Sequence, residues 1–531
     1  MPETTDDTGR IAKSAGAVSV AVMCSRVLGL VREQAFAVLF GAGFAYDAYV
    51  VAFRIPNLFR DLFGEGALSA AFVSVFADYD ANRGKAETWK LANNVLVFFA
   101  VLLSLLTIAG VVFAEPLVHL LVDAEFTQVA GKVELTRRLT VIMFPFLVLV
   151  SLAAVVMGIL NTRGRFFIPS LSSAFFNIGS IIGGVSLSFI LPYFGYPAIM
   201  GMAIGTLIGG FLQLSGQIPV LRKTGFRFRP RLDLKHPGLK RIVLLMVPAV
   251  VGLSATQFNV FINTRFASSC MEGSLSWLNY AFRLVQLPIG VVGVAISIAA
   301  LPVVSRYASV GNFTGLRDSL SSSLVMAFCL SLPASVGLWF LAEPIIQVIF
   351  EHGAFSAQDT ARTATALQWY SVGLFAYASV KIMVPVFYAL KDTRIPVAGS
   401  FLAVGANLLF VTLLIDTLSY KAIAVSTSAA MVINFLFLGV VLYIKLTGLK
   451  VGHILREVGK MLCACLIMGL WLYSFNSWGW EWFDQGIFSE VAGLFLSIGP
   501  AIVLYGGVLY LLRVRELTLL VDKVKARLIK D

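Results

Sequence analysis

The chain has 531 residues, of which 58% are hydrophobic and only 13% are charged, and this composition excludes every class except an integral membrane protein. Its net charge of +12 reflects 41 Lys and Arg residues against 29 Asp and Glu residues. We interpret this excess as topological, because most of it collects in alternate loops, and it therefore requires no nucleic-acid partner.

The predicted elements are transmembrane helices from the start of the chain. Residues 1–14 carry acids and lead into an apolar run too long for a signal peptide, so we expect a cytoplasmic N-terminus and a retained first helix. Apolar runs of roughly 20 residues or more predict fourteen helices in all. These helices fall near residues 15–42, 47–78, 91–115, 138–161, 166–191, 195–221, 242–268, 274–306, 320–342, 363–390, 395–416, 420–444, 458–476 and 488–512.

The loops that connect these helices differ in their content of Lys and Arg. Loops after even-numbered helices are basic, and the most basic is 223–241, whereas loops after odd-numbered helices are short or poor in basic residues. The loop after the third helix is an exception, since Lys132 and two arginines lie at its far end. The positive-inside rule places both termini in the cytoplasm. The tail 513–531 is typical of an amphipathic helix on the inner leaflet, and a plain cytoplasmic tail is the alternative.

The first two predicted helices contain charges at membrane depth. One arginine at the centre of a membrane helix costs about 2.5 to 3.5 kcal/mol, so four arginines facing lipid would cost on the order of 10 kcal/mol. We infer a protein-lined, water-accessible cavity with a positive lining that holds an anion. The charges in question are Arg26, Arg32, Glu33, Arg54, Arg60, Asp61 and Glu65.

Pairing among these charges is the alternative interpretation. Arg26 and Glu33 are seven residues apart, as are Arg54 and Asp61. Residues at that spacing share a helix face but lie about 10 Å apart, which is too far for an easy direct contact within one helix.

An internal repeat relates the two halves of the chain. Ala52-Phe53-Arg54 in the second helix matches Ala281-Phe282-Arg283 in the eighth, and LNTRGRFFIP after the fourth resembles LKDTRIP after the tenth. Both matches lie six helices apart, so the halves insert with the same orientation, as in two-lobed transporters. We predict an N-lobe over 15–222, a basic loop over 223–241, a C-lobe over 242–447 and two additional helices within 448–512. Pro and Gly residues interrupt the helices near the charges, at Gly29, Pro56, Gly64, Gly66, Pro288 and Gly290.

The type of cation points to the class of ligand. Arginine keeps its charge when buried and presents a planar fork that matches phosphate oxygens, which favours phosphate or pyrophosphate over an organic cation. Arg265 lies near a helix end, where snorkelling is the alternative, and Lys381 is either a cavity residue or a structural partner. No nucleotide-binding, nucleophile or metal motif occurs, so we predict no catalytic residue, no cofactor and no enzymatic activity.

Several phrases at these positions resemble the MurJ (MviN) family of lipid II flippases, which belongs to the multidrug/oligosaccharidyl-lipid/polysaccharide exporter superfamily. They occur in the family's order through about the first 400 residues. They are SRVLGLVRE from Ser25, DAYVVAFRIPNLFR from Asp47, GEGALSAAF from Gly64, GRFFIP from Gly164, SWLNYAFRLVQLPIG from Ser276, FEHGAF from Phe350 and YALKDT from Tyr388.

This resemblance implies a function in cell wall biogenesis and cell shape. It implies a multi-pass protein of the bacterial inner membrane that moves lipid II, the undecaprenyl-pyrophosphoryl precursor of peptidoglycan, from the cytoplasmic to the outer leaflet by alternating access. The implied partners are lipid II, the bilayer and cell-wall synthesis proteins.

The resemblance also assigns roles to individual residues. Four arginines match the family's cavity arginines by position, namely Arg26, Arg32, Arg60 and Arg283. We add Arg54 to these four as a fifth predicted substrate-binding residue. Three acids match the family's acidic residues near the cavity and gate, namely Glu33, Asp47 and Glu65. We add Asn57 and Asp61 to this gate and ion-pair set.

Two departures from the family pattern limit these assignments. Many members have an acid immediately before the eighth-helix arginine, where this chain has Phe282. Some members are thought to bind sodium through carboxylates, whereas the seventh helix here offers only Gln257, Asn259 and Asn263. We therefore predict no metal site.

Competing functions share part of this pattern. An exporter of another undecaprenyl-linked oligosaccharide is the main alternative. A cation-coupled drug exporter would show acids in the first lobe without the arginines, and a membrane glycosyltransferase or ligase would require large catalytic outer loops. A purely structural scaffold would not explain the cost of the buried arginines.

Overall fold

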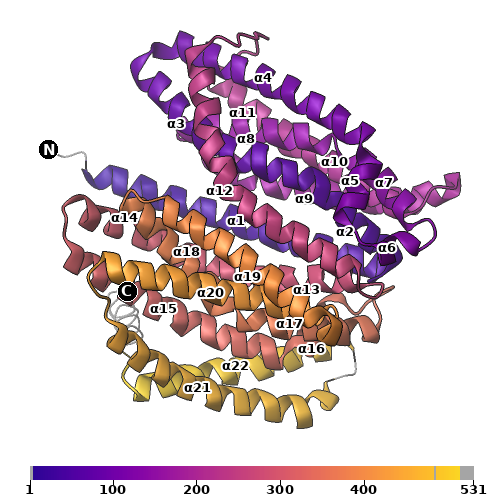
Figure 1. Cartoon of the computed structure of the whole chain (residues 1–531), viewed down its shortest axis with the longest axis vertical. Helices are drawn as coiled ribbons and strands as arrows, with labels where there is room; N and C mark the ends of the chain where they lie inside the picture. The colour runs from indigo at the N-terminus through magenta and orange to yellow at the C-terminus, as the bar shows by residue number, and fades with distance from the viewer. Residues whose placement is uncertain (1–3, 484–485, 515–531) are drawn as a thin grey trace. The chain divides into compact units, whose positions relative to one another are not determined.

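The structure is a computed structural model that describes residues 4–483 and 486–514 (Figure 1). Every regular element in these residues is helical, which confirms the predicted all-α polytopic class. Most of the predicted amphipathic tail, from residue 515 onward, lies outside the described residues.

The helical elements up to Ser268 include long helices and several short ones. Their bounds are α1 Thr4–Phe40, α2 Phe44–Phe59, η1 Arg60–Gly66, α3 Ala67–Asn82, α4 Gly84–Val112, α5 Ala114–Leu121, α6 Ala124–Gln128, α7 Lys132–Met143, α8 Phe146–Thr162, α9 Phe167–Ile190, η2 Leu191–Phe194, α10 Ile199–Ser215, α11 Ile218–Lys223 and α12 Pro237–Ser268.

The remaining helices follow the same pattern. Their bounds are α13 Ser274–Pro288, η3 Ile289–Val294, α14 Ala295–Ser309, α15 Phe313–Phe340, α16 Ala342–Phe350, α17 Ala357–Val372, α18 Leu374–Ala389, α19 Arg394–Leu418, α20 Lys421–Lys445, α21 Val451–Trp478, η4 Trp480–Trp482 and α22 Ile487–Leu511.

Eleven helical segments of the described chain are long and apolar enough to cross a membrane. A twelfth span results if α17 and α18, which meet at an angle of 44°, count as one. The predicted spans 15–42 and 47–78 are not among them. The first corresponds to α1, which carries several charges in its second half, and the second is divided into α2, η1 and α3. The total of fourteen therefore stays a prediction.

Packing divides the chain into two compact units that meet between Ser276 and Trp277. Helix α12 thus packs with the helices that precede it, although the predicted lobe boundary lay in the loop 223–241. Hydrogen bonds from Gln257 to Asp61 and from Arg54 to Thr264 join α12 to η1 and α2. The two transport lobes proposed from the repeat remain a prediction.

Each unit has its own hydrophobic core. In the first unit, Phe72 and Phe76 of α3 are fully buried against α4 and α8, and Ile242 brings α12 into the same cluster. In the second unit, α15 packs against α18, α20, α21 and α22. The hydroxyl of Tyr505 in α22 donates to the carbonyl of Cys329 in α15 at 2.9 Å.

Helices α9 and α10 approach each other unusually closely. Gly201, Gly205 and Gly209 recur every fourth residue along α10 and face α9. A Cβ atom on Gly205 would lie 2.5 Å from the Cα atom of Gly184, so only glycine fits there. This small-residue spacing is typical of tightly packed membrane helices.

Two π-helical segments interrupt the helices at the predicted Pro and Gly positions. The segment η1 follows Pro56 of α2, and η3 directly follows Pro288 of α13. Proline removes a backbone donor and displaces the preceding turn, and π-helical turns are frequent at functional sites. The two interruptions lie at corresponding places in the sequence repeat, one in each unit.

Candidate functional site

The first group of predicted site residues lies where α1 packs against α2 and α9. A guanidinium nitrogen of Arg32 donates to Oε1 of Glu33 at 2.8 Å, and the hydroxyl of Tyr46 donates to Oε2 of the same carboxylate at 2.7 Å. The Arg32 and Glu33 side chains are only 12% and 5% exposed. An ion pair this well buried requires the additional hydrogen bond from Tyr46 to offset its desolvation.

The Arg32 guanidinium has capacity left for a ligand. It lies over the ring of Phe176, 5.3 Å from the centroid, and its Nε is buried without a hydrogen-bond partner among the described residues. One turn and a half earlier, Arg26 is partly exposed, and its guanidinium forms no ion pair within the described part of the chain. Both guanidinium groups therefore have N–H groups that could donate hydrogen bonds to an anion.

The second group lies at the junction of α2 and η1. Arg60 donates through Nε and a terminal nitrogen to Oδ1 of Asp61, at 3.1 and 2.7 Å. The other carboxylate oxygen accepts from Asn57 at 3.4 Å and from Gln257 of α12 at 3.1 Å. Both charged side chains are about a quarter to a third exposed, at 24% and 32%, so water or a ligand can reach the pair.

Arg54, one helical turn before Asn57, points a guanidinium nitrogen at the hydroxyl of Thr264 in α12. That hydroxyl in turn donates to the carbonyl of Val260 at 2.6 Å. Arg54 is therefore positioned by α12 rather than by a carboxylate seven residues away.

Asp47 is the centre of a third, fully buried group. It is 2% exposed and its Oδ2 accepts from the ammonium of Lys132 at 3.0 Å and from the backbone N–H of Gly273 at 2.8 Å. Its Oδ1 accepts from the backbone N–H of Ser276 at 3.0 Å and from the Ser276 hydroxyl at 2.6 Å. The carboxylate thus caps the start of α13 from a helix more than 200 residues earlier in the chain.

Lys132 is a member of this group that sequence analysis did not assign to the site. It is 2% exposed, lies 4.8 Å from the ring centroid of Phe126, and is 3.6 Å from a carboxylate oxygen of Glu272. Its position in the sequence could have indicated this role. Lys132 is the first residue of α7, where the helix dipole disfavours a cation unless a nearby carboxylate compensates its charge.

In the second unit, Arg283 lies on α13 and is partly buried. The ring centroid of its neighbour Phe282 lies 5.2 Å from that of Tyr370 and 6.3 Å from that of Tyr377. Lys381 of α18 is exposed, and its Cβ would lie 3.4 Å from a Cβ placed on Gly293 in η3.

Among the described site residues, the structure pairs adjacent charges rather than charges seven residues apart. Glu33 pairs with Arg32 and Asp61 pairs with Arg60, whereas Asp47 pairs with the distant Lys132. Arg265 donates to the carbonyls of His119 and Val122, so it also fastens the end of α12 to the segment after α5. The side chain of Glu65 lies outside the described residues. No group of three or more His, Cys, Asp or Glu side chains that could hold a metal occurs among the residues that were placed.

This arrangement is suited to reversible anion binding. Each paired arginine holds a carboxylate with charge-assisted hydrogen bonds, and a phosphate oxygen offers the same geometry with more negative charge. A phosphate group can therefore exchange with the carboxylates without leaving a buried cation uncompensated.

Comparison with known proteins agrees with this chemistry. The family described as "Lipid II flippase MurJ" matches residues 36–491. A probable lipid II flippase MurJ of Bdellovibrio bacteriovorus is 32% identical over 97% of this chain and 97% of its own length. The corresponding protein of Vibrio cholerae is 34% identical over 95% of this chain and 97% of its own length.

Solved structures show the same similarity. A structure titled as lipid II flippase MurJ in an inward closed conformation superposes with a TM-score of 0.75 at 27% identity, covering 93% of this chain and 99% of that one. An inward-facing multidrug transporter of the MATE family gives a TM-score of 0.68 at 16% identity, covering 82% of this chain and 99% of that one, which shows a shared fold only.

Proposed function

Because this chain belongs to the lipid II flippase MurJ family, we propose that it is a flippase that moves lipid II from the cytoplasmic to the outer leaflet by alternating access. Lipid II is an undecaprenyl-pyrophosphoryl-linked precursor, so its transport supplies peptidoglycan synthesis. The chain is accordingly a multi-pass membrane transporter.

The observation that carries the proposed site is the cluster of arginines in α1, α2 and η1. Membrane helices seldom contain buried arginine unless it serves a ligand pathway. Arg32 keeps an unused Nε, and the Arg60 pair is accessible from outside the protein. We assign pyrophosphate binding to Arg26, Arg32, Arg54 and Arg60 in the first unit and to Arg283 in the second.

The paired carboxylates give the binding site a means of release. Pyrophosphate displaces Glu33 from Arg32 and Asp61 from Arg60 when lipid II enters. The same carboxylates reclaim the arginines when the substrate leaves, so the arginines are compensated by a negative charge in both states. Asn57 and Gln257 hold Asp61 near Arg60 while the site is occupied.

Asp47 acts as a gate residue in this account. It anchors the first turn of α13 to α2 and α7 through Gly273, Ser276 and Lys132. Alternating access requires α13 to change its position relative to the preceding helices, and this anchor stabilises one of the alternatives. Glu65 is assigned to the same gate by family resemblance.

The cellular setting follows from the family and from the distribution of charge. The protein resides in the bacterial inner membrane with both termini in the cytoplasm, because the basic loop 223–241 and the other basic loops share one side. The enzymes that make lipid II on the inner face and polymerise it on the outer face are the protein partners that this function requires.

Complementation tests this function. The chain is expressed in cells depleted of their own lipid II flippase, alongside variants Arg26→Ala, Arg32→Ala, Arg60→Ala and Arg283→Ala with membrane levels matched. Rescue by the wild type and loss of rescue in the variants are expected. If a well-expressed wild type does not rescue, the lipid II assignment is wrong and an exporter of another undecaprenyl-linked oligosaccharide is the better explanation. If all four variants rescue, the arginines have a structural role.

A further inference from the structure

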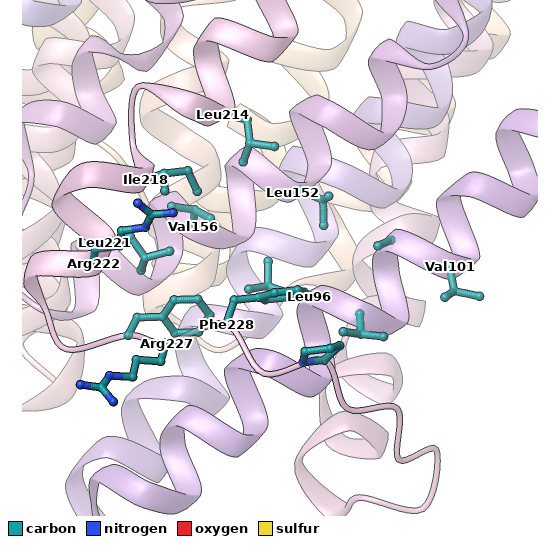
Figure 2. Close-up of a pocket in the computed structure, with 14 residues that line it drawn as sticks. Leu96, Val101, Leu152, Val156, Leu214, Ile218, Leu221, Arg222, Arg227 and Phe228 are labelled. Atoms are coloured by element: carbon teal, nitrogen blue, oxygen red, sulfur yellow. The ribbon is translucent and has the colours of Figure 1, made fainter.

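A cavity lies in the first unit, and none of the arginines described above lines it. Its volume is about 920 Å³, close to the upper end of the range for small-molecule sites in proteins. Helices α4, α8, α10 and α11 form its walls, and the chain from Phe226 to Pro230 forms its mouth (Figure 2). We refer to it as the α4–α8 groove.

The lining of the α4–α8 groove is apolar except at one place. Leu96 and Val101 of α4, Leu152 and Val156 of α8, and Leu214 of α10 contribute only hydrocarbon. Arg222 and Arg227 are the two polar lining residues, and both are exposed. Figure 2 shows both arginines at the opposite edge of the view from Val101.

The two arginines are available to a ligand. Within the residues that the structure places, neither guanidinium takes part in a salt bridge, although Arg163, Arg231 and Arg241 in the same unit each pair with an aspartate. An arginine fork matches the oxygens of a phosphate group, and Figure 2 shows the two guanidinium groups on the same side of the groove, pointing in different directions.

The mouth of the groove is held in position by two buried asparagines of α4. Asn93 donates to the carbonyl of Arg227 at 3.2 Å and accepts from the N–H of Arg229 at 2.7 Å. Asn94 holds both backbone groups of Asp233 in the same way, at 2.9 and 2.7 Å. These four hydrogen bonds make the segment that carries Arg227 part of the folded unit, so the site is formed before a ligand arrives.

The surroundings of the groove match a membrane surface. Beyond Val101, the exposed face of α4 continues with Leu105 and Ile108, both 60% exposed, which is typical of contact with lipid chains. The segment at the mouth alternates basic residues with the exposed Phe228 and Leu232, a pattern typical of the interface between headgroups and chains.

We propose that the α4–α8 groove binds an anionic phospholipid, with its headgroup at the end of the groove that Arg222 and Arg227 line and an acyl chain along α4 and α8. Basic pockets at the cytoplasmic end of membrane helices are common sites for such headgroups. The assignment to the inner leaflet rests on the cytoplasmic orientation proposed above for the loop 223–241.

The lining favours a phospholipid over the transported substrate. The headgroup of lipid II carries a disaccharide and a peptide, which require many hydrogen-bonding partners. Apart from Arg222 and Arg227, no lining residue has a polar side chain. A small anionic headgroup leaves no unsatisfied polar group in the groove, whereas a glycopeptide would leave many.

The test measures lipid binding to the purified full-length chain by native mass spectrometry. Phosphatidylglycerol and phosphatidylcholine with identical acyl chains are titrated onto the wild type, onto the double variant Arg222→Gln/Arg227→Gln, and onto the double variant Lys223→Gln/Arg229→Gln. The second double variant removes the same charge from the same segment, but neither of its residues lines the groove. A third variant, Ala100→Trp, fills the groove while keeping both arginines.

The wild type is expected to prefer phosphatidylglycerol. Arg222→Gln/Arg227→Gln should weaken the first phosphatidylglycerol bound by about tenfold, as expected for lost hydrogen bonds to a charged group, while the control double variant keeps the preference. Ala100→Trp should weaken both lipids at this site.

Equal loss in the two double variants, or no loss in the first, would overturn the proposal. Displacement of the bound phosphatidylglycerol by one equivalent of lipid II would also overturn it, because the groove would then belong to the substrate. The measurement does not depend on transport, so a failure of complementation leaves its outcome unaffected.

Discussion

The ammonium of Lys132 lies 3.0 Å from Oδ2 of Asp47, and both side chains are almost completely buried. The carboxylate is fully used, because it also accepts from Gly273 and Ser276. This ion pair joins α2 and α7 to the first turn of α13, where the first compact unit ends. This buried ion pair therefore lies at the segment that moves when the proposed gate opens.

Removing one partner of this pair should be costly. We expect Lys132→Met or Asp47→Ala to lower the free energy of unfolding by about 3 to 5 kcal/mol, because each removes the nearest ion-pair partner of a buried charge. The double variant Asp47→Asn/Lys132→Met should recover part of the loss, since no net charge stays buried. Thermal unfolding of the purified protein in detergent measures all three, and single variants as stable as the wild type would contradict the assignment.

Releasing Arg60 from its carboxylate should strengthen anion binding. We expect Asp61→Asn to increase the affinity for undecaprenyl pyrophosphate by about fivefold, since a partly exposed ion pair is worth roughly 1 kcal/mol or less. Transport in cells should fall, because release becomes slower. Asp78→Asn serves as the control, since Asp78 pairs with Arg241 at 2.7 Å outside this site. Unchanged affinity in Asp61→Asn would show that the carboxylate does not compete with the ligand.

The close approach of α9 and α10 should tolerate no added atoms. Gly205→Ala is expected to destabilise the protein by about 1 to 3 kcal/mol, because its Cβ would lie 2.5 Å from the backbone of Gly184. Gly405→Ala in α19 is the matched control, because nothing lies within 4 Å of its added Cβ. The control should be neutral or gain up to about 1 kcal/mol from helix propensity. Similar melting temperatures for the two variants would be inconsistent with the described packing.

Acid should weaken one loop contact of the second unit. A hydrogen bond from Lys445 is the main cause that holds the pKa of Asp392 below its ordinary value. A lowered folded-state pKa contributes stability above the unfolded value, near about 4, that is lost as the pH falls through the folded value. The wild type should therefore melt slightly above Lys445→Gln at pH 7, and the difference should shrink as the pH falls below about 4 and vanish once Asp392 is protonated in the folded state. A difference that persists in acid would show that the lysine acts through packing instead.

The helical class could be predicted from the sequence, because it depends on composition along the chain, whereas the anion-binding role of the arginines stays a prediction. Buried Arg32 and the interrupted helix after Pro56 follow from hydropathy and from proline geometry. The pairing could not be predicted in the same way. Neighbouring side chains do not face each other on a regular helix, yet Arg32 pairs with Glu33 within α1 and Arg60 pairs with Asp61 within η1.

Long-range packing explains what sequence analysis missed. Lys132 was interpreted as part of a loop because its partner Asp47 is 85 residues away. Likewise, the hydrogen bonds that join Gln257 and Thr264 of α12 to η1 and α2 span 196 and 210 residues of the chain. Neither relationship has a local pattern in the sequence.

The central claim is that arginines of the first unit bind the pyrophosphate of lipid II, and equilibrium binding of lipid II to the purified chain tests it most directly. Wild type, Arg60→Gln and Arg60→Lys are compared, with Arg241→Gln as an exposed control that lies outside the site. The account predicts that Arg60→Gln binds lipid II about tenfold more weakly, that Arg60→Lys is intermediate, and that the control equals the wild type. Wild-type affinity in a folded Arg60→Gln variant would contradict it.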